Sequence, residues 1–264
     1  MSRPLIPAQR RERIQNYLSV HRIAPISELS ELLFVSEATI RRDLEWMESE
    51  GILVRTHGGA ILNQQLQFEP EYQLRAQKNV EEKRAIGALA ASLIEDGQIV
   101  FINSGTTTTH LIRQIRSGLK CTVVTNNLTA ALEVGDGDFD LVLTGGTFQP
   151  KSNSVAGRFA IENLSQIYAD QAFIGVDGVA IKHGFTVPSS AEAEIIRLMI
   201  SRTKSSVNIV TDYSKWGVGS NFEIAKIDQV NRIITDDRLG PIVQEALENR
   251  AVEVLIASPS LEKT

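Results

Sequence analysis

The first fifty residues carry apolar side chains at intervals of three or four positions, which is the spacing of one face of an α-helix. This spacing predicts three helices, over residues 8–21, 27–33 and 37–50. Ser27 and Ser36 stand at the starts of the second and third helices, where a serine side chain can accept a hydrogen bond from a free backbone N–H. Gly51 follows the third helix, in the place where a glycine commonly ends one.

Residues 52–62 predict a β-hairpin. The runs "ILVRT" and "AIL" are short and apolar, and "HGG" between them supplies the glycines that tight turns need. Three helices followed by a hairpin make a winged helix-turn-helix, in which the hairpin is the wing. We therefore expect residues 1–62 to form one domain of this kind.

The rest of the chain predicts an α/β domain over residues 79–264. Residues 63–78 are polar and contain no glycine, so we expect them to be a linker of semi-rigid, helical character. Apolar runs then alternate with segments of helical spacing, which is typical of a largely parallel sheet. The expected strands are 98–103, 122–125, 140–146, 171–177, 206–212, 232–237 and 252–257. The expected helices are 79–97, 110–118, 126–134, 191–202 and 241–249.

Composition narrows the class of protein. The 264 residues are 42% hydrophobic and 22% charged, as in ordinary globular proteins. No apolar run approaches the roughly 18 residues of a membrane span, and the N-terminus lacks the apolar core of a signal peptide. Cys121 is the only cysteine, and the four histidines are scattered without cysteine partners. We expect a cytoplasmic protein with no disulfide, no metal site, no cofactor and no membrane partner.

The arginine pair in the third helix is the first candidate for function. On a helical wheel with about 100° per residue, Ile40, Leu44 and Met47 form a buried stripe, whereas Arg41 and Arg42 point outward. One interpretation is a solvated face on which these arginines pair with nearby acidic residues, which are Glu37, Asp43 and Glu45. The other is a recognition helix, whose N-terminal residues reach base edges in the major groove.

Overall charge does not decide between these interpretations. The net charge is −5, and residues 1–60 hold eight arginines and eight acidic residues. The combination of two helix caps, an arginine pair, a glycine stop and a hairpin favours DNA binding, because guanidinium groups suit both guanine and phosphate. The candidate DNA-binding residues are Ser36, Glu37, Ala38, Thr39, Arg41, Arg42, Arg55 and His57. Further candidates for phosphate contacts on the first helix are Arg10, Arg11 and Arg13.

The segment "ISELSELLFVSEATIRRDLEWMESEGILVRTHGGA" resembles the helix-turn-helix of the DeoR family. The hallmark of that family is the run Ser-x-x-Thr-Ile-Arg-Arg-Asp-Leu, followed by a glycine and a Gly-Gly wing. The resemblance continues in family order through "EEKRAIGALAASLIEDG", "NSGTTTT", "VVTNN", "LTGG", "AFIGVDG" and "TDYSKWG". It implies an effector domain similar in fold to ribose-phosphate isomerases and CoA-transferases. It also implies a repressor of a sugar-catabolism operon that a phosphorylated sugar induces.

The run "SGTTTT" at 104–109 is the candidate phosphate-binding loop. It joins a predicted strand to a predicted helix, and open α/β sheets bind ligands at the carboxyl ends of their strands. A glycine turn at a helix N-terminus offers N–H groups and the positive end of the helix dipole to an anion. From the residues alone, an ordinary turn capped by Ser and Thr hydroxyls is the stronger alternative. The family resemblance favours phosphate binding.

Other effector candidates follow later strands. Asn126 and Asn127 could bond sugar hydroxyls or cap a helix, and the glycine pair of "LTGG" could admit a ligand or simply make a tight turn. Asp177 could orient the sugar or merely cap a turn. Lys215 could pair with phosphate or with Asp212, or be only a solubilising surface lysine, so its effector role rests chiefly on the resemblance. Family members often have Asp where this chain has Asn103. The effector candidates are Asn103, Ser104, Gly105, Thr106, Thr107, Thr108, Asn126, Asn127, Gly145, Gly146, Asp177 and Lys215.

Two alternatives to a regulator stay open at this point. Sugar-phosphate isomerases need a carboxylate base near a lysine, and Asp177, Glu192 and Lys215 could supply such a set. A DNA-binding module gives the pocket a sensing role without turnover, so we expect no enzyme activity. An interaction module that binds neither DNA nor sugar is the other alternative. For a regulator, the expected partners are an operator duplex, a phosphorylated sugar and further copies of the chain, as a dimer or tetramer.

Overall fold

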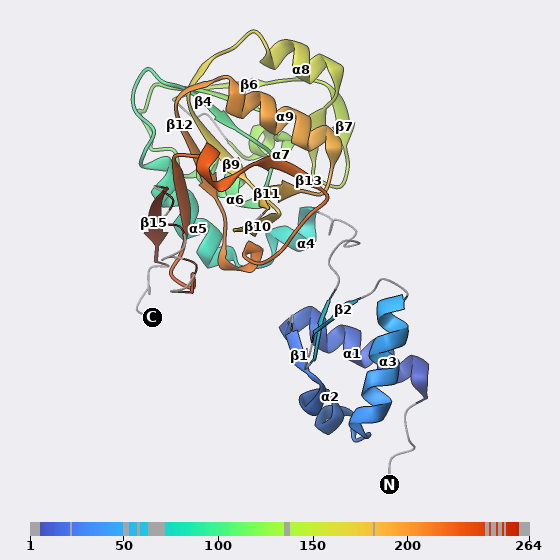
Figure 1. Ribbon diagram of the computed structural model, residues 1–264. Coiled ribbons are helices and arrows are strands. Elements are labelled where there is room, and N and C mark those ends of the chain that lie inside the picture. The colour runs from blue at the N-terminus through green and yellow to red at the C-terminus, as the bar shows by residue number, and fades with distance from the viewer. Residues whose placement is uncertain are drawn as a thin grey trace. The chain divides into compact units, whose positions relative to one another are not determined.

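The computed structural model describes residues 6–21, 23–49, 53–56, 59–62, 72–134, 138–181, 183–240, 243, 247, 250 and 252–258. The chain forms two compact units, Met1–Phe68 and Glu69–Thr264 (Figure 1). Each unit has its own hydrophobic core.

The first unit is a winged helix-turn-helix, as predicted. Its elements are α1 (Pro7–His21), β1 (Ile23–Pro25), α2 (Ile26–Leu33), α3 (Glu37–Ser49), β2 (Leu53–Thr56) and β3 (Gly59–Leu62). The antiparallel sheet has the order β1-β3-β2, so β2 and β3 form the predicted hairpin. The core contains the apolar side chains of all three helices, including Ile14, Leu18, Leu29, Ile40, Leu44 and Met47.

Two details of the first unit differ from the prediction. Helix α2 begins at Ile26, with Pro25 as its N-cap, whereas we expected Ser27 in that role. Ile26 is buried and Ser27 is exposed, so core packing starts the helix two residues earlier than a cap at Ser27 would. Strand β1 was not predicted, because three residues ending in proline show no alternation. The expected stop at Gly51 lies outside the described residues.

The second unit is built on a seven-stranded sheet with the order β15-β14-β12-β9-β4-β5-β6. Every neighbouring pair in this sheet is parallel, which confirms the predicted fold class. In their order across the sheet, from one edge to the other, its strands are β15 (Glu253–Ala257), β14 (Arg232–Asp236), β12 (Thr203–Val210), β9 (Ala169–Gly175), β4 (Ile99–Ile102), β5 (Thr122–Thr125) and β6 (Asp140–Leu143). A parallel sheet brings the carboxyl ends of its strands to one edge, where the effector candidates therefore gather.

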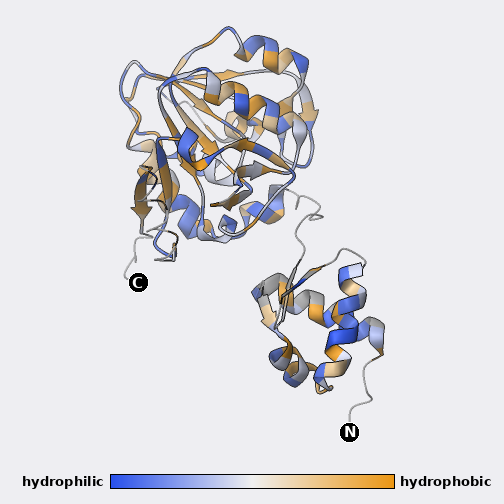
Figure 2. Ribbon diagram, viewed as in Figure 1, coloured by the Kyte–Doolittle hydropathy of each residue, from blue (hydrophilic) through white to orange (hydrophobic). Residues whose placement is uncertain are grey.

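Helices cover both faces of this sheet. The described helices of the unit are α4 (Tyr72–Ala76), α5 (Val80–Ala91), α6 (Thr106–Arg113), α7 (Leu128–Glu133), α8 (Arg158–Leu164) and α9 (Ser190–Ser201), with short 3-10 turns η2 (Tyr213–Lys215) and η3 (Ile227–Gln229). The strands are mostly hydrophobic, and the helices carry hydrophilic residues on part of their circumference (Figure 2). This is the pattern of a sheet that is buried on both sides.

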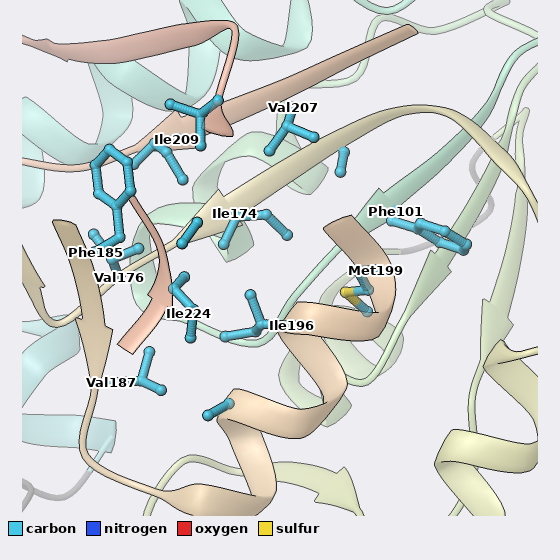
Figure 3. Packing of buried hydrophobic residues seen from close by; sticks show 14 of the residues in the cluster. Phe101, Ile174, Val176, Phe185, Val187, Ile196, Met199, Val207, Ile209 and Ile224 are labelled. Atoms are coloured by element: carbon cyan, nitrogen blue, oxygen red, sulfur yellow. The ribbon is translucent and has the colours of Figure 1, made fainter. Parts of the chain in front are cut away.

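Successive side chains of β4 lie on opposite faces of the large sheet. Phe101 joins the cluster formed with α8 and α9, in which Ile196 and Met199 point toward the strands (Figure 3). Val100 and Ile102 join the opposite cluster, which includes residues of α5, α6 and α7.

The structure also contains small strands that the sequence analysis missed. Two form the hairpin β7 (Thr147–Gln149) and β8 (Ser154–Ala156). Three form the antiparallel sheet β10 (Gly178–Ala180), β11 (Gly184–Val187) and β13 (Phe222–Ala225). Strands of three or four residues carry too few alternations to stand out from loops.

Several predicted boundaries in the second unit are wrong. Helix α6 begins at Thr106, so "TTTT" lies in the helix and not in a loop. The Thr108 and Thr109 hydroxyls donate to the Gly105 carbonyl oxygen, which lets β-branched residues occupy the first turn. Helix α5 ends at Ala91, well before Gly97. The predicted helix over 241–249 lies mostly outside the described residues.

The described part of the predicted linker belongs to the second unit. Residues 72–78 include helix α4, which packs against α6. The rest of the predicted linker, residues 63–71, lies outside the part of the chain that the structure describes. No helix in the described parts of the chain is long and apolar enough to cross a membrane.

Candidate functional site

The outer face of α3 presents the predicted recognition residues. Ile40, Leu44 and Met47 are buried on the inner face, which leaves Arg41 and Arg42 exposed. The Arg41 guanidinium pairs with Glu37 at 2.8 Å, whereas Arg42 has no such partner among the described residues. Arg42 is therefore the arginine of this pair that is available to a ligand without breaking an existing contact.

The N-terminus of α3 is capped as predicted. The Ser36 hydroxyl accepts a hydrogen bond from the Thr39 backbone N–H at 3.3 Å and lies 3.0 Å from the Thr39 hydroxyl. Ser36, Glu37 and Ala38 are exposed at this end of the helix. The cap fixes the first turn, where a recognition helix places its base-reading side chains.

Asp43 is buried in the first unit, and this corrects its expected place on the solvated face. Only 1% of Asp43 is exposed, and its two carboxylate oxygens accept hydrogen bonds from Arg10 at 2.7 Å and Arg11 at 3.2 Å. The Arg11 guanidinium also lies 3.9 Å from the centre of the Trp46 ring. Arg10 and Arg11 thus join α1 to α3, a structural role that the phosphate-contact prediction did not include. Arg13 is exposed.

The wing contains Arg55, which is also paired within the unit. Its guanidinium lies 3.1 Å from the Glu45 carboxylate, and its backbone N–H donates to Glu48 at 3.1 Å. These contacts connect β2 to α3. The predicted contact residue His57 lies outside the described residues.

The turn between β4 and α6 is the centre of the candidate effector site. Gly105 is the N-cap of α6, and the Ser104 backbone N–H donates to Asn126 Oδ1 at 2.8 Å. The backbone N–H groups of Thr106 and Thr107 have no acceptor among the described residues. They lie at the positive end of the helix dipole, so this turn has the donors that an anion requires.

Three predicted asparagines have their amides engaged within the protein. Asn103 donates to the Gly175 carbonyl oxygen at 3.0 Å and accepts from the Gly175 N–H at 2.7 Å, which ties β4 to β9. Asn126 donates to the Val155 carbonyl oxygen at 3.1 Å while it holds Ser104. Asn127 caps α7, which was the structural alternative for this residue. These side chains position the site.

The contacts of Asn103 explain why an amide suits this position. A carboxylate here could accept from the Gly175 N–H but has no hydrogen to donate to the Gly175 carbonyl oxygen. An amide at position 103 therefore satisfies both backbone groups of Gly175.

The glycine pair after β6 makes a tight turn, which was the second alternative for these residues. Gly145 and Gly146 have φ values of 67° and 123°, which side chains rarely adopt. A Cβ atom on Gly146 would also lie 2.5 Å from the Ala156 carbonyl oxygen. The backbone path therefore requires glycine at position 146 and favours it at position 145.

A group of charges completes the same edge of the sheet. The Asp177 carboxylate, which follows β9, lies 3.0 Å from the Arg75 guanidinium and 3.5 Å from the Lys215 ammonium. Burial alone would raise the pKa of Asp177, but Lys215 and Arg75 together hold this pKa below its usual value. Asp177 is therefore an ionised hydrogen-bond acceptor at neutral pH.

Sequence reasoning missed two cations of this group, Arg75 and Lys83. Lys83 is 3% exposed, and its ammonium donates to the Arg75 and Lys78 carbonyl oxygens. Burial lowers the pKa of Lys83 to about 8, opposed by Asp212 and assisted by the charge of Lys215. Both residues lie in polar, helix-forming stretches that look solvent-exposed in sequence. Glu192, the third residue of the isomerase alternative, is buried in the first turn of α9.

A winged helix-turn-helix on the same chain as an α/β unit with an anion-suited strand edge defines a transcriptional regulator with its own sensor. Residues 10–66 match the DeoR-like helix-turn-helix domain, and residues 78–237 match the DeoR C-terminal sensor domain. The chain belongs to the DeoR family of transcriptional regulators, as the sequence resemblance predicted.

Curated relatives match along nearly the whole chain. The HTH-type transcriptional regulator GlpR of Haloferax volcanii is 32% identical, over 95% of this chain and 98% of its own length. The HTH-type transcriptional repressor GlcR of Bacillus subtilis is 33% identical, over 92% of this chain and 93% of its own length.

Solved structures with partial likeness are enzymes and translation factors. The ribose 5-phosphate isomerase A of Methanocaldococcus jannaschii has 17% identity and a TM-score of 0.39, covering 53% of this chain and 55% of the isomerase. The translation initiation factor eIF-2B of Pyrococcus horikoshii has 13% identity and a TM-score of 0.44, covering 87% of this chain and 82% of the factor.

Proposed function

We propose that this regulator represses a carbohydrate catabolism operon and that a phosphorylated sugar releases it from its operator. The observation that carries the proposal is the start of α6, directly after the carboxyl end of β4, where two backbone N–H groups have no acceptor among the described residues. Lys215 and Asp177 stand at the same edge. The helix start suits the phosphate, and an ionised aspartate suits the sugar hydroxyls.

The DNA-binding half of the proposal rests on α3. Arg42 is exposed and uncommitted among the described residues, and the capped start of α3 is exposed beside it. A guanidinium in this place suits the acceptor atoms of guanine and the backbone phosphates. An effector releases DNA if it binds the DNA-free arrangement more tightly than the DNA-bound one.

The isomerase alternative is disfavoured by the state of Asp177. A general base works best when its pKa lies near the working pH. Two neighbouring cations hold the pKa of Asp177 below its usual value, which makes it a poor base for proton abstraction from a sugar carbon.

The test combines binding with turnover. An operator is first selected from random duplexes with the full-length protein. The melting temperature is then measured with ribose 5-phosphate, glucose 6-phosphate, fructose 6-phosphate and fructose 1-phosphate, with the parent sugars as controls. We expect one phosphate to raise the melting temperature and weaken the operator complex, with no isomer formed. Isomer formation would support the enzyme, and failure of every phosphate would refute this effector class.

We also propose that the chain acts as a homo-oligomer through the sensor unit. Strand β6 is an edge strand with one neighbour, β5. Val142 and Leu143, which are adjacent on β6 and so point to opposite faces, are 39% and 40% exposed. An edge strand with apolar groups exposed on both faces suits pairing with a second copy.

A further inference from the structure

Helix α4 is the first described element after the winged helix. β3 ends at Leu62 and α4 begins at Tyr72, so the chain between the DNA-binding unit and α4 is short. Although α4 belongs to the sensor unit, the sequence analysis assigned its residues to the linker of residues 63–78. Its side chains nevertheless contact both halves of the candidate effector site. The phosphate half is the turn at Gly105, and the other half is the charged group around Asp177.

Tyr72 contacts the phosphate half of the site through one hydroxyl. The Tyr72 Oη and Thr109 Oγ1 atoms lie 2.8 Å apart. The Thr109 hydroxyl donates its hydrogen to the Gly105 carbonyl oxygen, and it accepts from the Asn127 amide at 2.8 Å. A hydroxyl has one hydrogen and two lone pairs, so Tyr72 must be the donor. Tyr72, Thr109 and Gly105 thus form one hydrogen-bonded chain that ends in the anion-binding turn.

Arg75 contacts the other half of the site. Its guanidinium shares Asp177 Oδ1 with Lys215, at 3.0 Å and 3.5 Å respectively. A ligand that hydrogen-bonds to Asp177 or draws Lys215 toward a phosphate therefore changes the partner of Arg75. Because the Arg75 and Asp177 side chains are only 13% and 21% exposed, water replaces that partner poorly.

The end of α4 is fixed to the body of the sensor. The buried Lys83 holds the Arg75 and Lys78 carbonyl oxygens, and Asn79 donates to Asp212 at 3.0 Å. The start of α4, which is the end joined to the DNA-binding unit, is held by the Tyr72 hydroxyl contact to Thr109 and by the Tyr72 backbone N–H, which donates to the Lys151 carbonyl oxygen at 3.1 Å. Motion at this end therefore changes two hydrogen bonds, one of which leads to the anion-binding turn.

We propose that α4 is the element that couples the effector site to the DNA-binding unit. This inference rests on the proposed function for the nature of the effector. An anion at the start of α6 alters the Gly105 turn and the Asp177 pairing, which shifts Tyr72 and Arg75 and so moves the start of α4. The start of α4 follows the winged helix along the chain, so a shift there acts on the DNA-binding unit through the covalent connection.

The first experiment uses full-length Tyr72→Phe, which removes one hydroxyl, and the double variant Tyr72→Phe, Arg75→Met. Gln73→Ala, an exposed position on the same helix, is the matched control. In the wild type and the control, the sugar phosphate that acts in the panel should weaken operator binding about 5–150-fold. In the double variant, at ligand concentrations that saturate it by melting temperature, the sugar phosphate should weaken operator binding less than twofold. Tyr72→Phe should fall between them, and a double variant that responds like the wild type would overturn the proposal.

The second experiment does not depend on the effector, because coupling between two binding sites is reciprocal. Hydrogen exchange of residues 72–79 and 105–109 is measured with and without the selected operator duplex. We expect DNA to change exchange in both segments of the wild type and of Gln73→Ala, but not of the double variant. Unchanged exchange in the wild type would refute the coupling role of α4, even if no sugar phosphate binds.

Discussion

Asp43 is a charged side chain in the interior of the winged helix, and it is stable there because it forms ion pairs with two arginines of α1. In the sequence it stands next to Arg42 and looks like part of a solvated face. Its partners lie more than thirty positions earlier in the chain. The spacing of apolar residues predicted correctly that Ile40, Leu44 and Met47 are buried. It could not show which polar residue forms an ion pair with a residue distant in sequence.

Removing the Asp43 carboxylate should unfold the first unit more easily. Asp43→Ala leaves two arginines without their acceptor, and breaking such a buried pair costs about 3–5 kcal/mol. Urea denaturation followed by tryptophan fluorescence reports on this region, because Trp46 lies on α3 against Arg11. Glu37→Ala removes an exposed pair of the same helix and should cost less than about 0.5 kcal/mol. Equal losses for the two variants would contradict this account.

Arg42→Ala should abolish specific operator binding without changing stability. The side chain is exposed and has no partner among the described residues, so the fold loses nothing. Each good contact to a base gives about 1–3 kcal/mol of discrimination. Gel-shift titration measures the loss, and melting temperature checks the fold. Arg41→Ala is the comparison, because Arg41 is already paired with Glu37. Wild-type affinity in Arg42→Ala would show that this arginine does not touch DNA.

His110 should make the sensor unit sensitive to acid. Burial and the charges of Arg113, Lys83 and Arg84 lower its pKa from 6.5 to about 4. Between these values the unfolded chain binds a proton that the folded chain does not, so the free energy of unfolding falls as the pH falls. His110→Gln should remove up to about 3 kcal/mol of this dependence. Denaturation at pH 7 and pH 4.5 tests it, with the exposed His183→Gln as control.

At the scale of elements, the seven strands of the large sheet were predictable in their order along the chain, whereas the small strands, helices α4 and α8 and the role of polar residues were not. The β4–α6 turn follows from "INSG" and the threonines that follow it. The engagement of Asn103 with Gly175 depends on β9, which pairs with β4 only in the folded sheet. Helix α4 was assigned to a linker because it lies in the mostly polar stretch of residues 63–78 and its partners Thr109 and Asp177 are distant.

The start of α6 gives the prediction at this scale. Gly105→Asp should abolish the response to sugar phosphate and leave operator binding intact, because a carboxylate at the N-cap repels a phosphate. The Gly105 backbone is extended, and a Cβ atom there would meet only the Thr108 hydroxyl, at 3.1 Å, so the turn tolerates the side chain. Gly240→Asp, which adds the same charge in open space, is the control. Operator dissociation that follows the ligand as in the wild type would place the effector site elsewhere.

At the scale of the whole molecule, the open edge of the large sheet gives a prediction about assembly. Leu143→Glu puts a charge on β6 and should convert the oligomer to monomers at micromolar concentration, as measured by light scattering. Ile256→Glu is the matched control, because Ile256 is 38% exposed on β15 at the opposite edge of the same sheet. Monomeric wild-type protein, with and without operator, would refute the oligomer. Dissociation by Ile256→Glu alone would move the interface to β15.

The parallel sheet also determines when each half of the protein can fold during synthesis. All strand pairs of the winged helix lie within the first 62 residues, whereas Val100 pairs with Gln171 and Phe173 with Asn208. Contacts between distant residues form slowly, and N-terminal domains fold first on the ribosome. The half that binds DNA is therefore complete while the centre of the sensor is still unmade. For a short period, each new chain has a complete winged helix but lacks the sensor through which the proposed effector acts.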